Sequence, residues 1–471
     1  MRPRVILIAF CLATALVCAH ADTIHLKNGR TIVADRVREN GTRFEYEIGE
    51  DTYAIPKASV DRVDAGGVPS PNSGSTKMGD LPSFAPANSL ANEGDLVGKI
   101  IKEGKVDEGA LSDLEARHNP ELSATADFIA GKFEFDHGNI AHSRQFFESA
   151  LRFQPENSTI LIYYSAVLVR SGNASQAMYY AQRATKSAPD SADAYTMLGY
   201  AQFSADHTKE AVVSWKRSLE LRPDSKVQQL LSKAQREQTV ESDFSQGESS
   251  HFVLHYEGRQ TSDALRGQII ATLESDYDDL VRDLGSPPRD NIVVTLYTEQ
   301  AFFDVTHAPT WSGAINDGKL RIPINGLTSM TPELAHVLKH ELAHSFITQL
   351  SGGRCPMWLH EGVAQFEEPR SLNGEGHLIS ALFKTQRNIP LNALEGSFMN
   401  YSGAQASVAY AESLAAVSYI NDSYGMSDIQ RILERLGQGN SAESALRATI
   451  HSDYGQLETD LARYLSDKYG N

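Results

Sequence analysis

Cysteine is scarce in this sequence, with three in 471 residues: Cys11, Cys18 and Cys355. Cys11 and Cys18 fall in an N-terminal stretch with the features of a removable export signal, so the mature chain is expected to keep Cys355 alone. A single cysteine cannot form a disulfide within its chain, which excludes a small disulfide-stabilised fold. The stability of the mature protein is therefore expected to come mainly from side-chain packing.

Positive charge is also in short supply, because 43 Lys and Arg residues stand against 60 Asp and Glu residues, a formal net charge of −17. A chain of this charge repels phosphate backbones, which argues against nucleic-acid binding. Long apolar runs are lacking apart from residues 5–17, which are too few to span a bilayer comfortably. This run follows Arg2 and Arg4 and precedes a small-residue cleavage pattern at 19–21, which predicts a secretory signal peptide over residues 1–21. We therefore expect an exported, periplasmic or extracellular protein without a transmembrane segment after signal removal.

The N-terminal part of the mature chain has the pattern of a small all-β module. Between residues 22 and 65, short β-like runs alternate with turn signals, which predicts five strands in a small open barrel or curled sheet. Its expected role is binding or docking. Residues 66–93 are rich in Gly, Pro, Ser and Asn, which predicts a flexible linker and independent movement of the β module.

A 34-residue repeat follows the linker. Several positions recur at this spacing: Phe147, Ala181 and Trp215; Ala150, Ala184 and Ser218; and Pro155, Pro189 and Pro223. The third copy is the clearest, and with Tyr195, Leu198, Gly199 and Ala211 it resembles a tetratricopeptide (TPR) repeat. The resemblance implies three units at 124–157, 158–191 and 192–225, within a helical region from 94 to 240. Such units stack into a solenoid whose concave face usually binds peptides or partner proteins, although a structural spacer is the alternative.

The region from residue 249 to 471 has an α+β pattern. Its β-like runs at 251–256, 291–297 and 319–324 alternate with helical stretches. Pro323 in the last run predicts an edge strand, because proline has no N–H to donate to a neighbouring strand. The free backbone groups of such an edge could pair with an extended peptide, while the helical C-terminal half closes the cleft.

The most informative motif of this region is His-Glu-x-x-His at residues 340–344. Residues four apart share one face of a helix, so His340 and His344 can bind one metal ion with Glu341 on the same side. A helix is expected here on separate grounds, because Thr331 and Pro332 form a start signal and Gly352 begins a stop signal.

A third ligand is expected further along the chain, since a catalytic zinc usually takes three protein ligands and a water. Glu361 is the best candidate, because the 17 residues after His344 give room for a loop and a second, returning helix. His360 and Cys355 are the rival candidates.

The first motif together with Trp358-Leu359-His360-Glu361-Gly362-Val363-Ala364 resembles the gluzincin (thermolysin-like, Peptidase MA) metallopeptidases over roughly residues 249–471. The resemblance implies Zn²⁺ held by His340, His344 and Glu361. Glu341 would then take a proton from a zinc-activated water and return it to the leaving amine. The substrate implied is a peptide or protein.

Four further residues have weaker claims to a role. His336 lies a helical turn before His340, too far from His344 to share its ion, and is expected as a flanking or second-shell residue. Gln365 could orient a ligand histidine through its amide, with a core role as the alternative. The oxyanion needs a donor beyond the metal, and by the family resemblance this is Tyr410, with Tyr401 as its rival and core packing as the alternative for both.

These observations predict a multidomain protein: a small all-β N-terminal module, an α-solenoid of TPR type, and an α+β zincin-like metallopeptidase domain. The function expected is that of a secreted or periplasmic zinc peptidase whose repeats bind a protein partner. The main alternative is a TPR scaffold with a vestigial metallopeptidase domain, and a third possibility is a different metal-dependent hydrolysis. The intact His340, Glu341, His344 and Glu361 argue against a vestigial site.

Overall fold

The structure is a computed structural model. It describes residues 22–27, 31–34, 36–48, 51–64, 90, 93–258, 261–306, 314–324, 326–372, 374–398, 401 and 403–470. The predicted signal peptide at 1–21 and almost all of the predicted linker at 66–93 lie outside these residues. The chain divides into two compact units, Met1–Pro71 and Asn72–Asn471. No helix within the described ranges is long and apolar enough to cross a membrane.

The first unit contains two antiparallel sheets of three strands, with the orders β2-β1-β6 and β3-β4-β5. The prediction of five strands in one curled sheet was therefore incomplete. Gly41, with a φ of +58°, turns the chain between β3 and β4, as the Asn-Gly signal at this point suggests. The elements are β1 (Asp22–Leu26), β2 (Thr31–Ala34), β3 (Arg36–Asn40), β4 (Arg43–Ile48), β5 (Asp51–Pro56), the short helix η1 (Lys57–Ser59) and β6 (Val60–Asp64).

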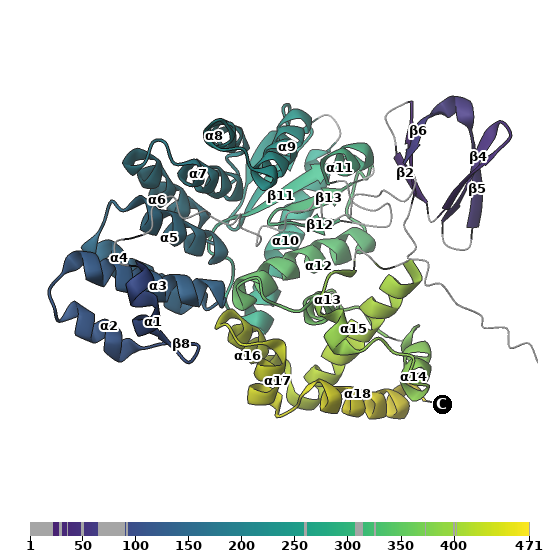
Figure 1. Ribbon diagram of the computed structural model, residues 1–471. Helices are drawn as coiled ribbons and strands as arrows, with labels where there is room; N and C mark the ends of the chain where they lie inside the picture. Colours follow the sequence, from purple (N-terminus) through teal and green to yellow (C-terminus); the bar gives the residue numbers. More distant parts are fainter. Residues whose placement is uncertain are drawn as a thin grey trace, which may run out of the picture. The chain divides into compact units, whose positions relative to one another are not determined.

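The second unit begins with helices that form successive antiparallel pairs (Figure 1). The pairs α5–α6 and α7–α8 start at Ser158 and Ala192, the first residues of two predicted 34-residue units. Side chains of Asn, Ser or Asp accept backbone N–H groups at the starts of α3, α4, α5, α7 and α9. The elements are α1 (Glu93–Ile100), β7 (Ile101–Lys102), β8 (Lys105–Val106), α2 (Glu108–Glu115), α3 (Pro120–Asp136), α4 (Ile140–Phe153), α5 (Ser158–Arg170), α6 (Ala174–Ser187), α7 (Ala192–Ser204), α8 (Thr208–Leu221) and α9 (Ser225–Val240).

The first and third pairs are closed by complementary side-chain sizes on their two helices. In the third pair a Cβ atom added to Gly199 would lie 2.7 Å from the indole of Trp215, which is fully buried. In the first pair, two 34-residue steps earlier, Gly131 stands in the same relation to Phe147 at 2.8 Å. The glycine on one helix thus makes room for the aromatic ring on the other, as close packing of interiors requires.

The rest of the second unit is built on a five-stranded sheet with the order β12-β13-β11-β10-β9. Strands β10, β11 and β13 are parallel, and the two outer strands are antiparallel to their neighbours. The sheet elements and the helices between them are β9 (Ser245–Glu248), β10 (Phe252–Tyr256), α10 (Asp263–Leu284), β11 (Ile292–Tyr297), α11 (Glu299–Thr306), β12 (Ile315–Asn316) and β13 (Leu320–Pro323).

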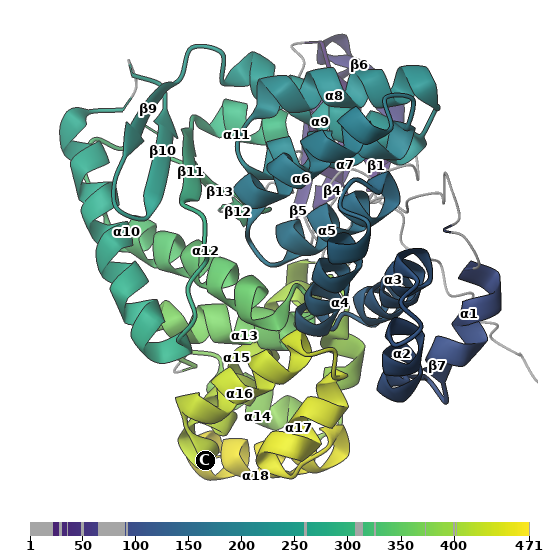
Figure 2. The same cartoon turned by 90° about the vertical axis from the view of Figure 1, so that its left-hand side faces the viewer.

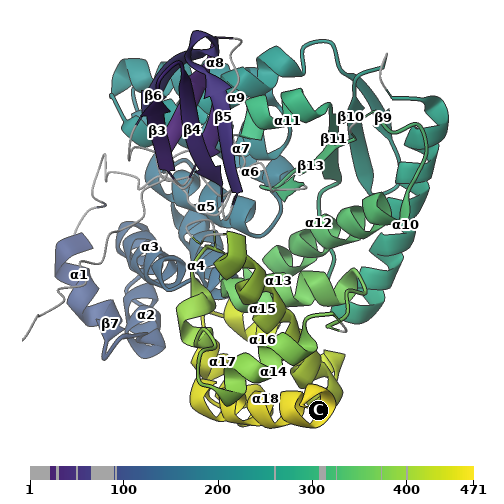
Figure 3. The ribbon, with the colours of Figure 1, turned by 90° about the vertical axis from the view of Figure 1, so that its right-hand side faces the viewer.

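Helices α12 and α13 lie between this sheet and the C-terminal helices, as Figures 2 and 3 show from opposite sides. Together with α10 and the sheet they form one continuous apolar core, which includes the buried Phe346 and Trp358. The remaining elements are α12 (Pro332–Ser351), α13 (Met357–Glu367), α14 (Gly376–Lys384), η3 (Leu391–Glu395), α15 (Gly403–Tyr424), α16 (Met426–Gly437), α17 (Ala442–Ile450) and α18 (Tyr454–Tyr469).

The prediction that residues 319–324 form the edge of the sheet is wrong. β13 lies between β11 and β12, so the edge is formed by the two-residue strand β12. β12 pairs only with Leu320 and Arg321 of β13. Pro323 therefore needs no N–H on that side, because it lies beyond the end of β12.

The turn within each helical pair is docked to the sheet-containing remainder of the second unit, which we call the sheet domain. The turns within the three pairs contain Gly138, Gly172 and Asp206, spaced by 34 residues and all with φ between +65° and +79°. The first two are in close contact with Arg354 and Gln349, since a Cβ atom on either glycine would collide with that side chain. Asp206 replaces glycine in the third turn, and its carboxylate is 2.7 Å from Lys319 Nζ and 2.9 Å from His255 Nε2.

Five buried charged residues join α9 to the turn between β12 and β13, and we call them the α9 charge cluster: Lys233, Glu237, Asp317, Lys319 and Arg321. The Arg321 side chain is fully buried and lies 2.7 Å from Glu237 and 3.0 Å from Asp317. Burial alone would raise the pKa of the Asp317 carboxyl, but Arg321 and Lys233 hold it well below its ordinary value. The cluster is therefore a set of true ion pairs.

Candidate metal centre

Helix α12 carries the His-Glu-x-x-His motif, and both of its predicted ends are confirmed. The Thr331 hydroxyl accepts the N–H of Leu334, Pro332 occupies the first turn, and Gly352 ends the helix in a left-handed conformation. His340 and His344 consequently project from one face of a helix anchored at both ends.

The two imidazoles converge with Glu361, which is carried by α13. The distance between the Nε2 atoms of His340 and His344 is 3.1 Å, and Glu361 Oε2 lies 3.5 and 3.7 Å from them. A tetrahedral ion with ligands at about 2.0 to 2.1 Å holds those ligands about 3.4 Å apart. These three side chains form the one group of potential metal ligands found among the described residues. Two nitrogens and a carboxylate oxygen at these separations fit a zinc ion.

The two rivals for the third ligand lie outside this group. The ring of His360 instead stacks on His344, with ring centres 4.5 Å apart and an interplanar angle of 8°. Its Nε2 lies 3.4 Å from the Thr348 hydroxyl, one turn further along α12. His360 therefore supports the ring of a candidate ligand, and the carboxylate of Glu361 completes the group.

Gly362 sets how closely α13 approaches α15. A Cβ atom at this position would lie 2.5 Å from the backbone oxygen of Ser413 and 2.6 Å from Val417 Cγ2. No side chain fits between the two helices there, so the glycine fixes the position of α13 and with it that of the neighbouring Glu361.

We expect the substitution Gly362→Ala to lower the free energy of unfolding by about 1 to 3 kcal/mol, as overpacking usually does. Urea denaturation of the full chain measures this effect. Gly267→Ala is the matched control, because Gly267 is an exposed helical glycine with open space at its Cβ position. That substitution should stabilise α10 by about 0.5 to 1 kcal/mol. Equal effects of the two substitutions would contradict the close approach of α13 and α15.

Glu341 is buried beside the three ligand candidates, with 7% of its surface exposed. Burial raises the pKa of its carboxyl to about 7, with His340 opposing this shift and Glu361 and Glu368 adding to it. The pKa of His340 rises to about 10, because its hydrogen bonds to Glu361 and Glu368 outweigh the effect of burial. A divalent cation bound here would replace that proton and would itself balance the negative charge of the carboxylates.

Glu368 is a site residue that the sequence analysis missed. Its Oε2 lies 3.2 Å from Nδ1 of His340, the ring nitrogen that faces away from the ligand group. A carboxylate in this position orients a ligand imidazole and increases its basicity. The available signal was spacing, since Glu368 follows Glu361 by seven residues, about two helical turns, directly after the last residue of α13.

Glu368→Ala is expected to weaken zinc binding by about 10-fold to 100-fold while leaving the fold intact. Competition with a chromophoric zinc chelator would measure the affinity. Glu375→Ala serves as the control, because Glu375 forms a half-exposed ion pair with Arg370 at 3.6 Å, outside the ligand group. Unchanged affinity of the Glu368→Ala variant would rule out the proposed support of His340.

Gln365 and His336, the residues expected around the ligands, have different surroundings. Gln365 is buried, but its Nε2 donates to the backbone oxygens of Glu361 (3.2 Å) and Tyr410 (3.0 Å) and to no histidine. It ties α13 to α15, which fits the core role given as the alternative, and its orientation of a ligand imidazole stays a prediction. His336 is exposed on α12 and is not part of the converging group.

The two tyrosines considered as oxyanion donors are now distinguishable. Burial, followed by the charges of Glu361 and Glu341, raises the pKa of Tyr410 well above its ordinary value. The hydroxyl of Tyr401 instead donates to the backbone oxygen of Ala393 at 3.4 Å. The choice of Tyr410 as the donor stays a prediction.

Comparison with known families gives an independent indication. Residues 277–467 match the Peptidase MA superfamily. The matched segment contains α12, α13 and all three ligand candidates, and it supports a peptidase. No curated protein matches the chain.

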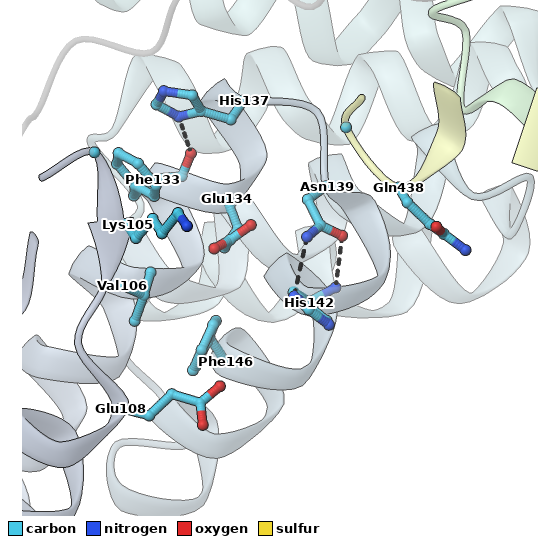
Figure 4. Close-up of a pocket in the computed structure, with 12 residues that line it drawn as sticks. Lys105, Val106, Glu108, Phe133, Glu134, His137, Asn139, His142, Phe146 and Gln438 are labelled. Carbon is cyan, nitrogen blue, oxygen red and sulfur yellow. Dashed lines mark hydrogen bonds between the residues drawn. The ribbon is translucent and has the colours of Figure 1, made fainter. Parts of the chain in front are cut away.

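The segment that matches the Peptidase MA superfamily also lines a pocket away from the three ligand candidates. Gln438 and Gly439 line a pocket of about 300 Å³ together with residues of β8, α3 and α4 (Figure 4). The pocket contains two histidines, but His137 Nδ1 donates to the Phe133 oxygen at 2.7 Å and His142 bonds to Asn139 at 3.0 Å. The arrangement has no converging third ligand, unlike the group at residues 340, 344 and 361.

Proposed function

We propose that this protein is an exported, zinc-dependent, gluzincin-like peptidase that hydrolyses peptide bonds with a metal-activated water. The observation that carries the proposal is the convergence of His340, His344 and Glu361 next to the buried Glu341, within a segment that matches the Peptidase MA superfamily. Zinc bound by these three side chains would lower the pKa of a coordinated water to about 7 and polarise the substrate carbonyl.

The chain's own residues would supply the remaining steps. Glu341 would accept the proton of the attacking water and deliver it to the leaving amine, for which a carboxyl pKa near 7 is well suited. Tyr410 would donate a hydrogen bond to the developing oxyanion, since its raised pKa keeps the phenol protonated. An extended peptide would pair its backbone with the outer edge of β12, which replaces residues 319–324 as the proposed docking strand.

We further propose that the helical pairs are TPR-like and bind a protein partner. Two large apolar side chains are exposed at equivalent positions of consecutive pairs, Tyr179 on α6 and Val213 on α8, 34 residues apart. These exposed side chains are available to a partner. The turns of the pairs, in contrast, are already used for docking to the sheet domain. Export is proposed on the signal-like pattern at residues 1–21.

Metal removal tests the proposed activity. The purified chain should contain about one zinc per molecule and cleave an unstructured protein, and 1,10-phenanthroline should abolish cleavage until zinc is added back. The 1,7 isomer, which cannot chelate, is the control. Zinc content is measured by plasma mass spectrometry and cleavage by gel electrophoresis. Cleavage that persists in metal-free protein would refute the proposal.

A further inference from the structure

The edge strand β12 is tied directly to the middle of the metal-site helix. Asn316 Nδ2 donates to the backbone oxygen of Glu341 and to the hydroxyl of Ser345, each at 2.7 Å. Its Oδ1 accepts the N–H of Gly318 at 3.0 Å, so both ends of the amide are engaged. Asn316 therefore connects the strand proposed to receive the peptide with the residue proposed as general base.

The residue after Asn316 is held from the opposite side by the helical repeats. Asp317 lies 2.8 Å from Lys233 Nζ on α9 and 3.0 Å from Arg321 Nε. Arg321 in turn pairs with Glu237, one helical turn after Lys233, at 2.7 Å. The β12–β13 turn is thus fixed between α12 on one side and α9 on the other.

We propose that Asn316 is a positioning residue for the hydrolysis and that Lys233 and Glu237 of the repeat segment hold it in place. This inference rests on the proposed peptidase function. Backbone pairing joins β12 to β13, and the two directional hydrogen bonds from the Asn316 amide to α12 set the position of the strand along that helix. The helical repeats then form part of the catalytic unit, in addition to any role in binding partners.

The physical reason is the demand for accurate placement in the reaction. Glu341 must reach both the attacking water and the leaving amine of a peptide lying along β12. A misplacement of about 1 Å can lower the rate about 100-fold, even when it originates away from the reacting atoms. Asn316 sets the distance between β12, where the peptide would bind, and Glu341 on α12. Neither β12 nor α12 can set this distance by itself.

The first test is Asn316→Ala in the full-length, zinc-loaded chain. We expect kcat for internally quenched peptides to fall about 10-fold to 100-fold at unchanged zinc content. Asn440→Ala is the matched control, because it also removes a side-chain amide that donates to a helix carbonyl, that of Arg435 at 2.9 Å in α16. Its kcat should equal that of the wild type. Equal kcat for the wild type and the Asn316→Ala variant would overturn the proposal.

The second test separates positioning from general stability through the repeat segment. Lys233→Met should lower kcat and speed hydrogen exchange in residues 314–323, whereas Lys233→Arg, which keeps the charge, should restore both. Unchanged kcat and exchange in Lys233→Met would show that α9 does not hold the strand. If the wild type cleaves no peptide, the peptidase proposal fails, and the exchange measurement still decides whether α9 fixes β12.

Discussion

The Glu341→Gln variant is expected to keep its zinc and to lose about 10²-fold to 10⁴-fold in kcat. Glutamine has nearly the same shape as glutamate but cannot accept a proton, so the three metal ligands should remain in place. Glu341 is the buried carboxylate next to those ligands, and its pKa of about 7 suits proton exchange near neutral pH. Zinc content and steady-state kinetics on internally quenched peptides would be measured on the same preparation.

Glu333→Gln provides the comparison for this variant. Glu333 lies on the same helix but is exposed in its first turn, two turns before the motif, so its kcat should match the wild type. Full activity in Glu341→Gln would mean that another group acts as base. Loss of zinc together with activity would give Glu341 a structural role and remove the support for the assigned mechanism.

Arg321→Met is expected to destabilise the second unit by about 3 to 5 kcal/mol, the usual cost of removing one partner from a buried ion pair. Arg321 is fully buried and donates to Glu237, Asp317 and the hydroxyl of Tyr297. Without it, the three carboxylates of Glu237, Glu241 and Asp317 would share only the two ammonium groups of Lys233 and Lys319. Urea denaturation followed by tryptophan fluorescence would report the loss, since Trp215 and Trp358 are both fully buried.

An exposed ion pair gives the matched control. Arg217 lies 3.0 Å from Glu220 on the surface of α8, with 43% of its side chain accessible. Because solvent screens such pairs, Arg217→Met should leave the free energy of unfolding almost unchanged. Similar small effects for both variants would show that the α9 charge cluster is hydrated and weakly paired in solution.

The sequence predicted those parts of the metal centre that depend on local spacing. The ends of α12 follow from Thr331 and Gly352, whose capping preferences act within one helical turn. The shared face of His340 and His344 follows from helical geometry alone. Glu368 could not be assigned in the same way, because the face of α13 that meets His340 depends on how α13 packs against α15.

The edge strand and the α9 charge cluster were missed for related reasons. β12 has only two residues, too few to show a strand period. In β13 and the residue before it, Lys319 and Arg321 alternate with Leu320 and Ile322, the pattern of a strand with one solvated face. All four are nevertheless buried, because α9 covers the charged face and supplies its counter-charges. Such a contact between distant segments leaves no local trace in the sequence.

The docking of the turns at Gly138, Gly172 and Asp206 fixes the length of the repeat array. Most solenoids can gain or lose a unit during evolution, because each unit touches only its neighbours. Here every unit also meets a different part of a second surface, through side chains that are not interchangeable. A duplicated or deleted unit would place each later turn opposite the wrong partner. The number of units in this array therefore cannot change without the loss of these contacts.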